Sequence, residues 1–134
     1  MISAVVCLAM AVYYEARSEP LAGQLAVAAV ILNRVDDDRH PDNVCEVVTE
    51  GPTHASGHPI RHRCQFSFWC DGKPERPRHK QAWKTAKVVA EIMLYQPIDL
   101  SEGATFYHTV DVSPRWRFSM DQTVVIGRHR FYRR

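Results

Sequence analysis

The sequence predicts an α+β fold, in which a helical N-terminal half packs against a small antiparallel β-sheet. Three observations lead to this prediction. Segments of helical length and apolar or amphipathic pattern occupy residues 2–34 and 76–94. Candidate strands gather near the C-terminus, at residues 104–110 and 123–132. Helices and strands therefore do not alternate as they do in parallel βαβ folds.

Length and composition suit one domain spanning residues 1–134. The chain has 134 residues, 46% of them hydrophobic, which is enough for a self-supporting core. Seventeen Lys and Arg residues against fifteen Asp and Glu residues give a net charge of +2. Because dedicated nucleic-acid binders are strongly basic, we rank that function last.

The first two helices are predicted from apolar runs. Residues 2–16 form the first, and the stretch Ala4–Tyr14 carries no charge, which indicates a central, buried helix. Ser18-Glu19-Pro20 interrupts the chain, and residues 20–34 form the second helix. Glu19 is expected at the start of that helix, where a negative charge favours the helix dipole.

The remaining elements are shorter. Residues 43–48 are predicted to form a short helix, and residues 51–63, rich in Gly, Pro and His, an exposed loop. Polar and apolar side chains alternate over residues 65–69, which predicts a strand. Residues 76–94 form an amphipathic helix, and residues 104–110 and 123–132 form two strands.

The N-terminus imitates a secretory signal peptide, but the basic n-region is missing. The second apolar run, residues 21–32, is shorter than the ~20 residues that span a bilayer. We therefore expect a soluble protein without a visible export signal of its own and without stable membrane insertion.

The four cysteines contain no CxxC pair. Cys7 lies in an apolar stretch and is expected to be a buried free thiol. Cys45, Cys64 and Cys70 flank loop-rich sequence. One disulfide among these three and fully reduced thiols are equally compatible with their spacing.

Glu15 is the candidate catalytic residue. Leu8, Val12 and Glu15 are spaced i, i+4 and i+7, so they share one helix face. A carboxyl group held against apolar surroundings resists ionisation, as a general acid working near neutral pH must. The alternative stays open: Glu15 pairs with Arg17 or Arg34, or simply ends the helix in water.

Aromatic rings next to polar side chains are typical of sugar-binding surfaces, because sugars stack on rings while their hydroxyls need polar partners. The candidate substrate-binding residues of this kind are Gln65, Phe66, Ser67, Trp69, Tyr107, His108 and Trp116. Trp69 and Trp116 lie beside turn signals, which favours partial exposure. Trp83 and Phe106 are expected to be core residues.

One loop contains several residue types that can bind a metal. His54, His58, His62 and Cys64 lie close together in sequence, but their spacing matches no closed zinc motif and they lack acidic partners. We therefore expect a solvated loop, with no metal and no cofactor.

A series of different short motifs follows one another along nearly the whole chain. They include Tyr14-Glu15-Ala16-Arg17-Ser18-Glu19-Pro20, Asn33-Arg34-Val35, Cys64-Gln65-Phe66-Ser67-Phe68-Trp69-Cys70-Asp71-Gly72, Tyr107-His108 and Ile126-Gly127. In this order they resemble the SleB/CwlJ-type cell wall hydrolases, typified by spore-cortex-lytic enzymes.

The resemblance implies a lysozyme-like fold with a substrate groove between the helical part and the small sheet. It also implies cleavage of peptidoglycan glycan strands between N-acetylmuramic acid and N-acetylglucosamine. The family's catalytic acid is the first Glu of a Glu-Ala-Arg-Gly-Glu motif, which falls on Glu15. Ser18 stands where the family usually has Gly.

A lone acid favours a lytic transglycosylase. The other carboxylates considered, Asp71, Glu102, Asp111 and Asp121, all lie in turn-like sequence. In a transglycosylase the substrate's own 6-hydroxyl attacks, and Glu15 serves first as acid and then as base. The product carries a 1,6-anhydro end.

Two other functions remain open from the sequence: a metal-dependent amidase that cuts the peptide stem, and a non-catalytic wall-binding module. The partner expected in each case is bacterial peptidoglycan, bound by a monomer. A small wall hydrolase without an export signal is similar to a bacteriophage endolysin released through a holin pore.

Overall fold

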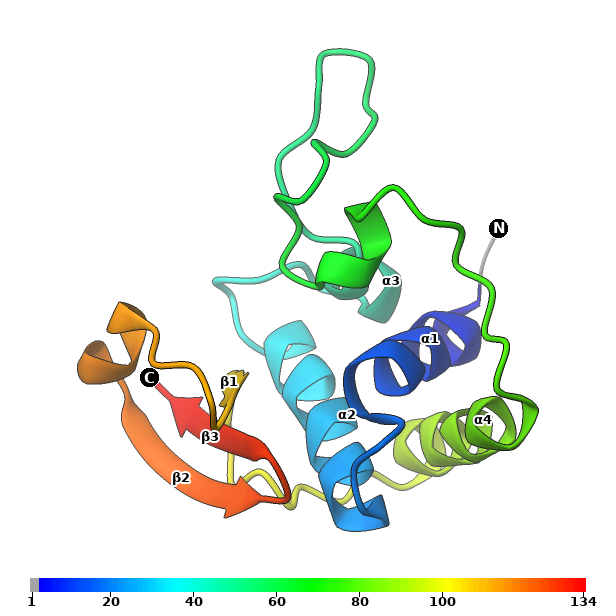
Figure 1. Ribbon diagram of the computed structural model, residues 1–134. Coiled ribbons are helices and arrows are strands. Elements are labelled where there is room, and N and C mark those ends of the chain that lie inside the picture. The colour runs from blue at the N-terminus through cyan, green and yellow to red at the C-terminus, as the bar shows by residue number, and fades with distance from the viewer. Residues whose placement is uncertain (1–2) are drawn as a thin grey trace.

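The computed structural model describes residues 3–134 and shows a helical group beside a small sheet (Figure 1). The α-helices are α1 (Ala4–Ala16), α2 (Leu21–Val35), α3 (Val44–Val48) and α4 (Lys80–Tyr95). The strands are β1 (Phe106–Thr109), β2 (Asp121–Ile126) and β3 (His129–Arg133), and the 3-10 helices are η1 (Ser67–Cys70) and η2 (Arg115–Ser119). The predicted α+β class is confirmed.

Helix α1 is the centre of the helical group, as predicted. It contacts α2, α3 and α4, and its Leu8 and Val12 side chains are completely buried. The Ser3 hydroxyl accepts a hydrogen bond from the Val6 N–H at 3.3 Å and so caps the first turn. The helix begins at Ala4, two residues later than predicted; residue 2 lies outside the described residues.

Helix α2 lies between the other helices and the sheet (Figure 1). Ala28 and Ile31 pack into the larger core with α1. Val27 and Val30 pack into a second cluster with Phe131 of β3. The helix therefore joins two hydrophobic cores.

The sheet is antiparallel, with strand order β1–β3–β2. The single strand predicted over residues 123–132 is wrong, because the chain reverses between Ile126 and His129, which are partners in the ladder. Gly127 makes the reversal possible: its φ is +57°, and a Cβ there would collide with the Glu19 carboxylate.

Glu19 has a different role from the one predicted. Its carboxylate turns towards the β2–β3 hairpin and accepts a hydrogen bond from the Arg128 N–H at 2.7 Å. Pro20 occupies the N-cap position of α2, and the first turn of that helix contains no acidic residue. Glu19 therefore anchors the hairpin instead of capping a helix.

The strand predicted over residues 65–69 is also wrong. Cys64 and Cys70 form a disulfide with a Cα–Cα distance of 6.1 Å. Six extended residues would span about 20 Å, so the bridged segment must coil. It forms η1, and the alternating pattern reflects the burial of Phe66 and Phe68 beside the exposed Gln65 and Ser67.

Cys7 is not a free thiol. It forms a disulfide with Cys45, which ties α1 to α3 across 38 residues of sequence. With the Cys64–Cys70 bridge, this accounts for all four cysteines of the chain.

The last helix starts later than predicted. Pro77 and the residue before it disfavour helical geometry, so α4 begins at Lys80 and not at residue 76. The His79 Nδ1 caps it by accepting from the Ala82 N–H at 3.1 Å.

The loop of residues 51–63 projects from the molecule as predicted, and most of it is exposed (Figure 1). Within residues 3–134, no helix has both the length and the apolar character needed to cross a membrane.

Candidate functional site

A cavity of about 250 Å³ opens where the helical group meets the sheet. Its walls come from α1, α2, β1, η2 and the segment before η1, so no two neighbouring elements could build it alone. The lining residues are Glu15, Arg34, Gln65, Phe66, Phe106, Tyr107 and Trp116. The groove expected between helices and sheet is therefore present.

Glu15 enters this cavity from the last turn of α1. The two residues that share its helix face, Leu8 and Val12, are fully buried, so the backbone at Glu15 is held by the core. The Tyr107 hydroxyl donates a hydrogen bond to Glu15 Oε1. Burial raises the pKa of the Glu15 carboxyl, and the Tyr107 hydrogen bond and the Arg34 charge oppose this rise without cancelling it.

Tyr107 is held in place by its own neighbours. Its ring lies 4.9 Å from the ring of His129 and 5.7 Å from that of Phe131, measured between centroids. Burial and the adjacent Glu15 raise the pKa of Tyr107 well above its ordinary value. The phenol therefore keeps its proton and remains a hydrogen-bond donor.

Arg34 is a buried cation that also lines the cavity. Its Nε donates to the Thr105 carbonyl oxygen at 2.7 Å, and its Nη1 lies 3.9 Å from Glu50 Oε1. Burial lowers the pKa of Arg34, although the group stays far from neutrality at physiological pH. Within residues 3–134 it forms no ion pair with Glu15, so it acts on that carboxyl only as a nearby charge.

Aromatic rings form most of the remaining cavity wall, together with Gln65. Phe106 and Trp116 are in contact, with centroids 5.4 Å apart, and the Arg34 guanidinium lies 4.8 Å from the Phe106 ring centre. Phe66 also lines the cavity. The expectation that Phe106 belongs to the core is wrong, because its ring is half-buried and lines the cavity.

The cavity brings together five of the predicted site residues: Glu15, Gln65, Phe66, Tyr107 and Trp116. Sequence reasoning missed Phe106 and considered Arg34 only as an ion-pair partner. Phe106 is adjacent to Tyr107 in sequence, which is the signal that could have found it. Arg34 reaches the same region from α2 by donating to the Thr105 carbonyl oxygen, a contact that sequence spacing does not indicate.

Three predicted residues lie elsewhere. Ser67 is exposed on η1. Trp69 lines a different depression, below the loop of residues 51–63. His108 faces away from Glu15, and its ring nitrogens are engaged with Thr109 O at 2.7 Å and the Tyr132 hydroxyl at 2.8 Å.

Glu15 is the one carboxylate among the described residues that line the cavity. Asp71, Glu102, Asp111 and Asp121 are all absent from its walls. The site therefore offers one titratable acid, together with a phenol that stays protonated and a guanidinium that stays charged.

The loop of possible metal ligands does not converge. Cys64 is bonded to Cys70, and His54, His58 and His62 are exposed. No group of three His, Cys, Asp or Glu side chains within residues 3–134 has the proximity that a metal site requires.

The comparisons with known proteins agree on one family. The model of the family described as Cell Wall Hydrolase matches residues 18–132. The match begins after Glu15 and does not include that residue.

Curated relatives are named as spore cortex-lytic enzymes. Those of Halalkalibacterium halodurans and Bacillus subtilis are 38% and 35% identical over 125 residues, which is 92% of this chain in both cases. The matched part makes up 33% and 35% of these two proteins. The chain thus spans about a third of their length.

Two solved structures share the fold over 97% of this chain. One is the catalytic domain of the germination-specific lytic transglycosylase SleB from Bacillus anthracis, with a TM-score of 0.75, 31% identity and 93% of that chain covered. The other is the catalytic domain of SleB from Bacillus cereus, with a TM-score of 0.70, 30% identity and 89% covered.

Proposed function

The chain belongs to the cell wall hydrolase family, and on this premise we propose that it cleaves peptidoglycan glycan strands between N-acetylmuramic acid and N-acetylglucosamine as a lytic transglycosylase. The name and fold of the SleB catalytic domains support this reading over that of an amidase. The observation that carries it is a single half-buried carboxyl, Glu15, in an aromatic cavity.

The first step is proton donation. Burial raises the pKa of Glu15, which favours the protonated form that a general acid needs. Tyr107 occupies Oε1, which leaves Oε2 to carry the proton. Glu15 gives this proton to the glycosidic oxygen as the bond between that oxygen and the anomeric carbon breaks, and the leaving sugar departs with a free hydroxyl.

The second step closes a ring on the muramic acid. Its 6-hydroxyl oxygen forms a bond to the anomeric carbon, and the Glu15 carboxylate takes the hydroxyl proton. The 1,6-anhydro product forms without water, and Glu15 regains its starting state. Tyr107 and Arg34 stabilise the carboxylate between the two steps, because both favour the anion.

The aromatic walls would hold the sugars. Phe66, Phe106 and Trp116 present rings to the cavity, and Gln65 adds an amide for sugar hydroxyls. A hydrolase of the two-carboxylate kind would need a second acid about 5–9.5 Å from the first. The cavity lining of residues 3–134 contains no such partner, which favours the transglycosylase.

The chemical structure of the new glycan chain ends distinguishes this proposal from the alternatives. Purified peptidoglycan is digested in water enriched in oxygen-18, and the products are analysed by mass spectrometry. We expect 1,6-anhydro ends, lighter by one water than reducing ends and free of the heavy isotope. Reducing ends that carry oxygen-18 would show hydrolysis instead, and released peptide stems on intact glycan would show an amidase.

A further inference from the structure

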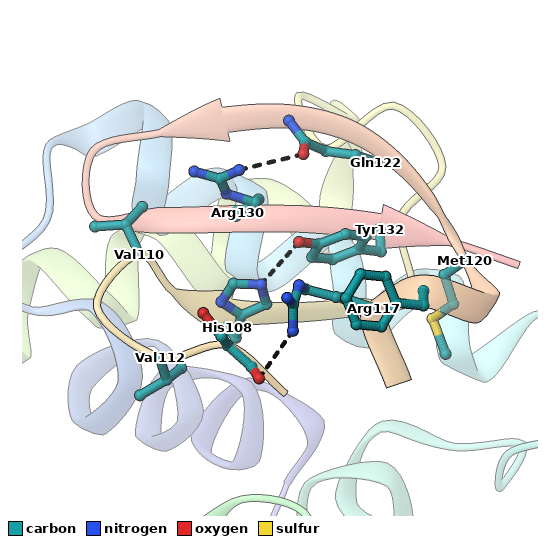
Figure 2. A pocket seen from close by; sticks show the side chains of 10 residues that line it. His108, Val110, Val112, Arg117, Met120, Gln122, Arg130 and Tyr132 are labelled. Atoms are coloured by element: carbon teal, nitrogen blue, oxygen red, sulfur yellow. Dashed lines mark hydrogen bonds between the residues drawn. The ribbon is translucent and has the colours of Figure 1, made fainter. Parts of the chain in front are cut away.

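A second cavity, of about 320 Å³, lies on the face of the sheet that points away from α2 (Figure 2). His108 of β1 and Arg130 and Tyr132 of β3 share this face, because His108 pairs with Arg130 and side chains alternate along a strand. Gln122 of β2 and Arg117 of η2 complete the polar lining. The volume is in the range of small-ligand sites, roughly 300–1,000 Å³.

This cavity adjoins the catalytic one through Trp116. The Trp116 ring lines the cavity of Glu15, and its centroid lies 5.6 Å from that of His108 and 5.3 Å from that of Tyr132. Both of these partners line the second cavity. The two cavities therefore lie on either side of the Trp116 ring.

The second cavity is positively charged. Two arginines line it, and no carboxylate of residues 3–134 does. Arg117 is fixed by hydrogen bonds from its Nη1 to the carbonyl oxygens of Ser113 and Pro114, each at 2.9 Å. Neither arginine forms an ion pair in this part of the chain, so both charges remain available to an anion.

Arg130 has a donor without an acceptor. Its Nη1 makes a long contact of 3.4 Å with Gln122 Oε1, which Figure 2 shows, while its Nε is buried and has no hydrogen-bond partner. Buried polar groups are nearly always paired. Arg130 lines the cavity, and a guanidinium can donate two hydrogen bonds to one carboxylate.

The rim of the cavity is apolar and exposed. Val112 and Phe118 also line it, and they are 49% and 78% exposed. The combination of cations at the base and apolar groups at the rim suits a short peptide that carries both carboxylates and methyl groups. Peptidoglycan bears such a peptide, since the lactyl group of muramic acid carries a stem of alanine and acidic residues.

We propose that the cavity between η2 and the sheet binds a carboxylate of the peptide stem through Arg117 and Arg130, so that the enzyme prefers stem-bearing glycan strands to stem-free ones. This inference rests on the proposed cleavage of glycan strands for the choice of ligand. Its first test, however, does not require cleavage.

The first test measures binding of a soluble stem tetrapeptide by titration calorimetry, beside the same peptide with amidated carboxylates. The amidated peptide should bind at least about tenfold more weakly, as expected for the loss of a charge-assisted bidentate pair. Arg130→Gln and, separately, Arg117→Gln should weaken binding of the acidic peptide by a similar factor. Arg133→Gln removes the same charge from an exposed position of β3 and should stay within about twofold of the wild type.

The second test compares cleavage of stem-bearing strands with cleavage of strands whose stems have been removed. The ratio of the two rates should exceed one in the wild type, fall several-fold in Arg130→Gln and keep its wild-type value in Arg133→Gln. Equal binding of the acidic and amidated peptides, or equal rates on both strands, would overturn the stem site while leaving glycan cleavage intact. Carboxylate-dependent peptide binding without any glycan cleavage would support the stem site and contradict the proposed function.

Discussion

The Tyr107 hydroxyl donates a hydrogen bond to Glu15 Oε1 and thereby joins β1 to the last turn of α1, across 92 residues of sequence. This bond and the nearby Arg34 charge lower the pKa of a carboxyl that burial raises. The pKa of Glu15, on α1, therefore reflects opposing effects: burial raises it, and Tyr107 of β1 and Arg34 of α2 lower it.

Replacing Glu15 with Gln should lower the rate of glycan cleavage by about 10²–10⁴-fold, the usual contribution of a general acid. The isosteric amide keeps an acceptor for Tyr107, so the protein should stay folded. Rates of product release and thermal unfolding check both expectations. Glu91→Gln, on the exposed side of α4, is the matched control. Wild-type cleavage by the Glu15 variant would refute the catalytic assignment.

The same variant should change how stability depends on pH. Because the folded-state pKa of Glu15 is raised, the folded protein holds a proton that the unfolded chain releases above its ordinary pKa of 4.5. Its contribution to stability is fully present below that pKa and is lost as pH rises through the folded pKa, by about 1.4 kcal/mol per unit of difference. The free energy of unfolding of Glu15→Gln relative to the wild type should therefore rise with pH over this window. Denaturant titrations at a series of pH values measure it, and a constant difference would contradict the raised pKa.

Tyr107→Phe should raise the pKa of Glu15 further, because it removes a hydrogen bond that stabilises the carboxylate. Cleavage requires the acid form at the start, so the alkaline limb of the pH–rate profile should move to higher pH. The maximal rate should fall, since Glu15 loses its positioning partner, and the free energy of unfolding should fall by about 1 kcal/mol. A reduced rate with an unmoved alkaline limb would assign Tyr107 a purely structural role.

The two disulfides should contribute differently. By loop length, the Cys7–Cys45 bridge should stabilise the fold by about 4 kcal/mol and the Cys64–Cys70 bridge by about 2 kcal/mol. The Cys64–Cys70 bridge, however, encloses the segment that contains Phe66, and Phe66 lines the cavity that contains Glu15.

Replacing both cysteines of each disulfide with Ala, one disulfide at a time, should separate the effect on stability from the effect on activity. The Cys7/Cys45 variant should lose more stability in urea titrations, and the Cys64/Cys70 variant should lose more activity relative to its folded fraction. The reverse order of activities would show that the segment of residues 65–69 holds its shape without the bridge.

The tryptophans give a further comparison. Trp116 lines the cavity that contains Glu15, and Trp69 lines a separate depression. Trp116→Ala should lower kcat/KM for glycan strands by about tenfold, the effect expected from the loss of 1–2 kcal/mol of ring contacts. Trp69→Ala should have a smaller effect. Equal losses in both variants would indicate that the bound strand extends across η1.

Local pattern was enough to predict the helical half of the fold. The uncharged run from Ala4 to Tyr14 specified a buried helix, and the spacing of Leu8, Val12 and Glu15 placed a carboxyl at the end of its apolar face. These properties depend on residues within a few turns of one another, so helical periodicity reports them directly. The predicted monomeric state and single-domain organisation stay predictions.

Tertiary structure decided what surrounds that carboxyl. Tyr107, Arg34 and Phe106 reach Glu15 from β1 and α2, and the disulfide between Cys64 and Cys70 turned an alternating segment into η1. The physical reason is that burial and electrostatic coupling depend on distance in space, and residues far apart in sequence become neighbours only through the packing of α2 between the helices and the sheet. The sequence by itself therefore predicted which residue serves as the acid, and only the folded structure decided what surrounds its carboxyl.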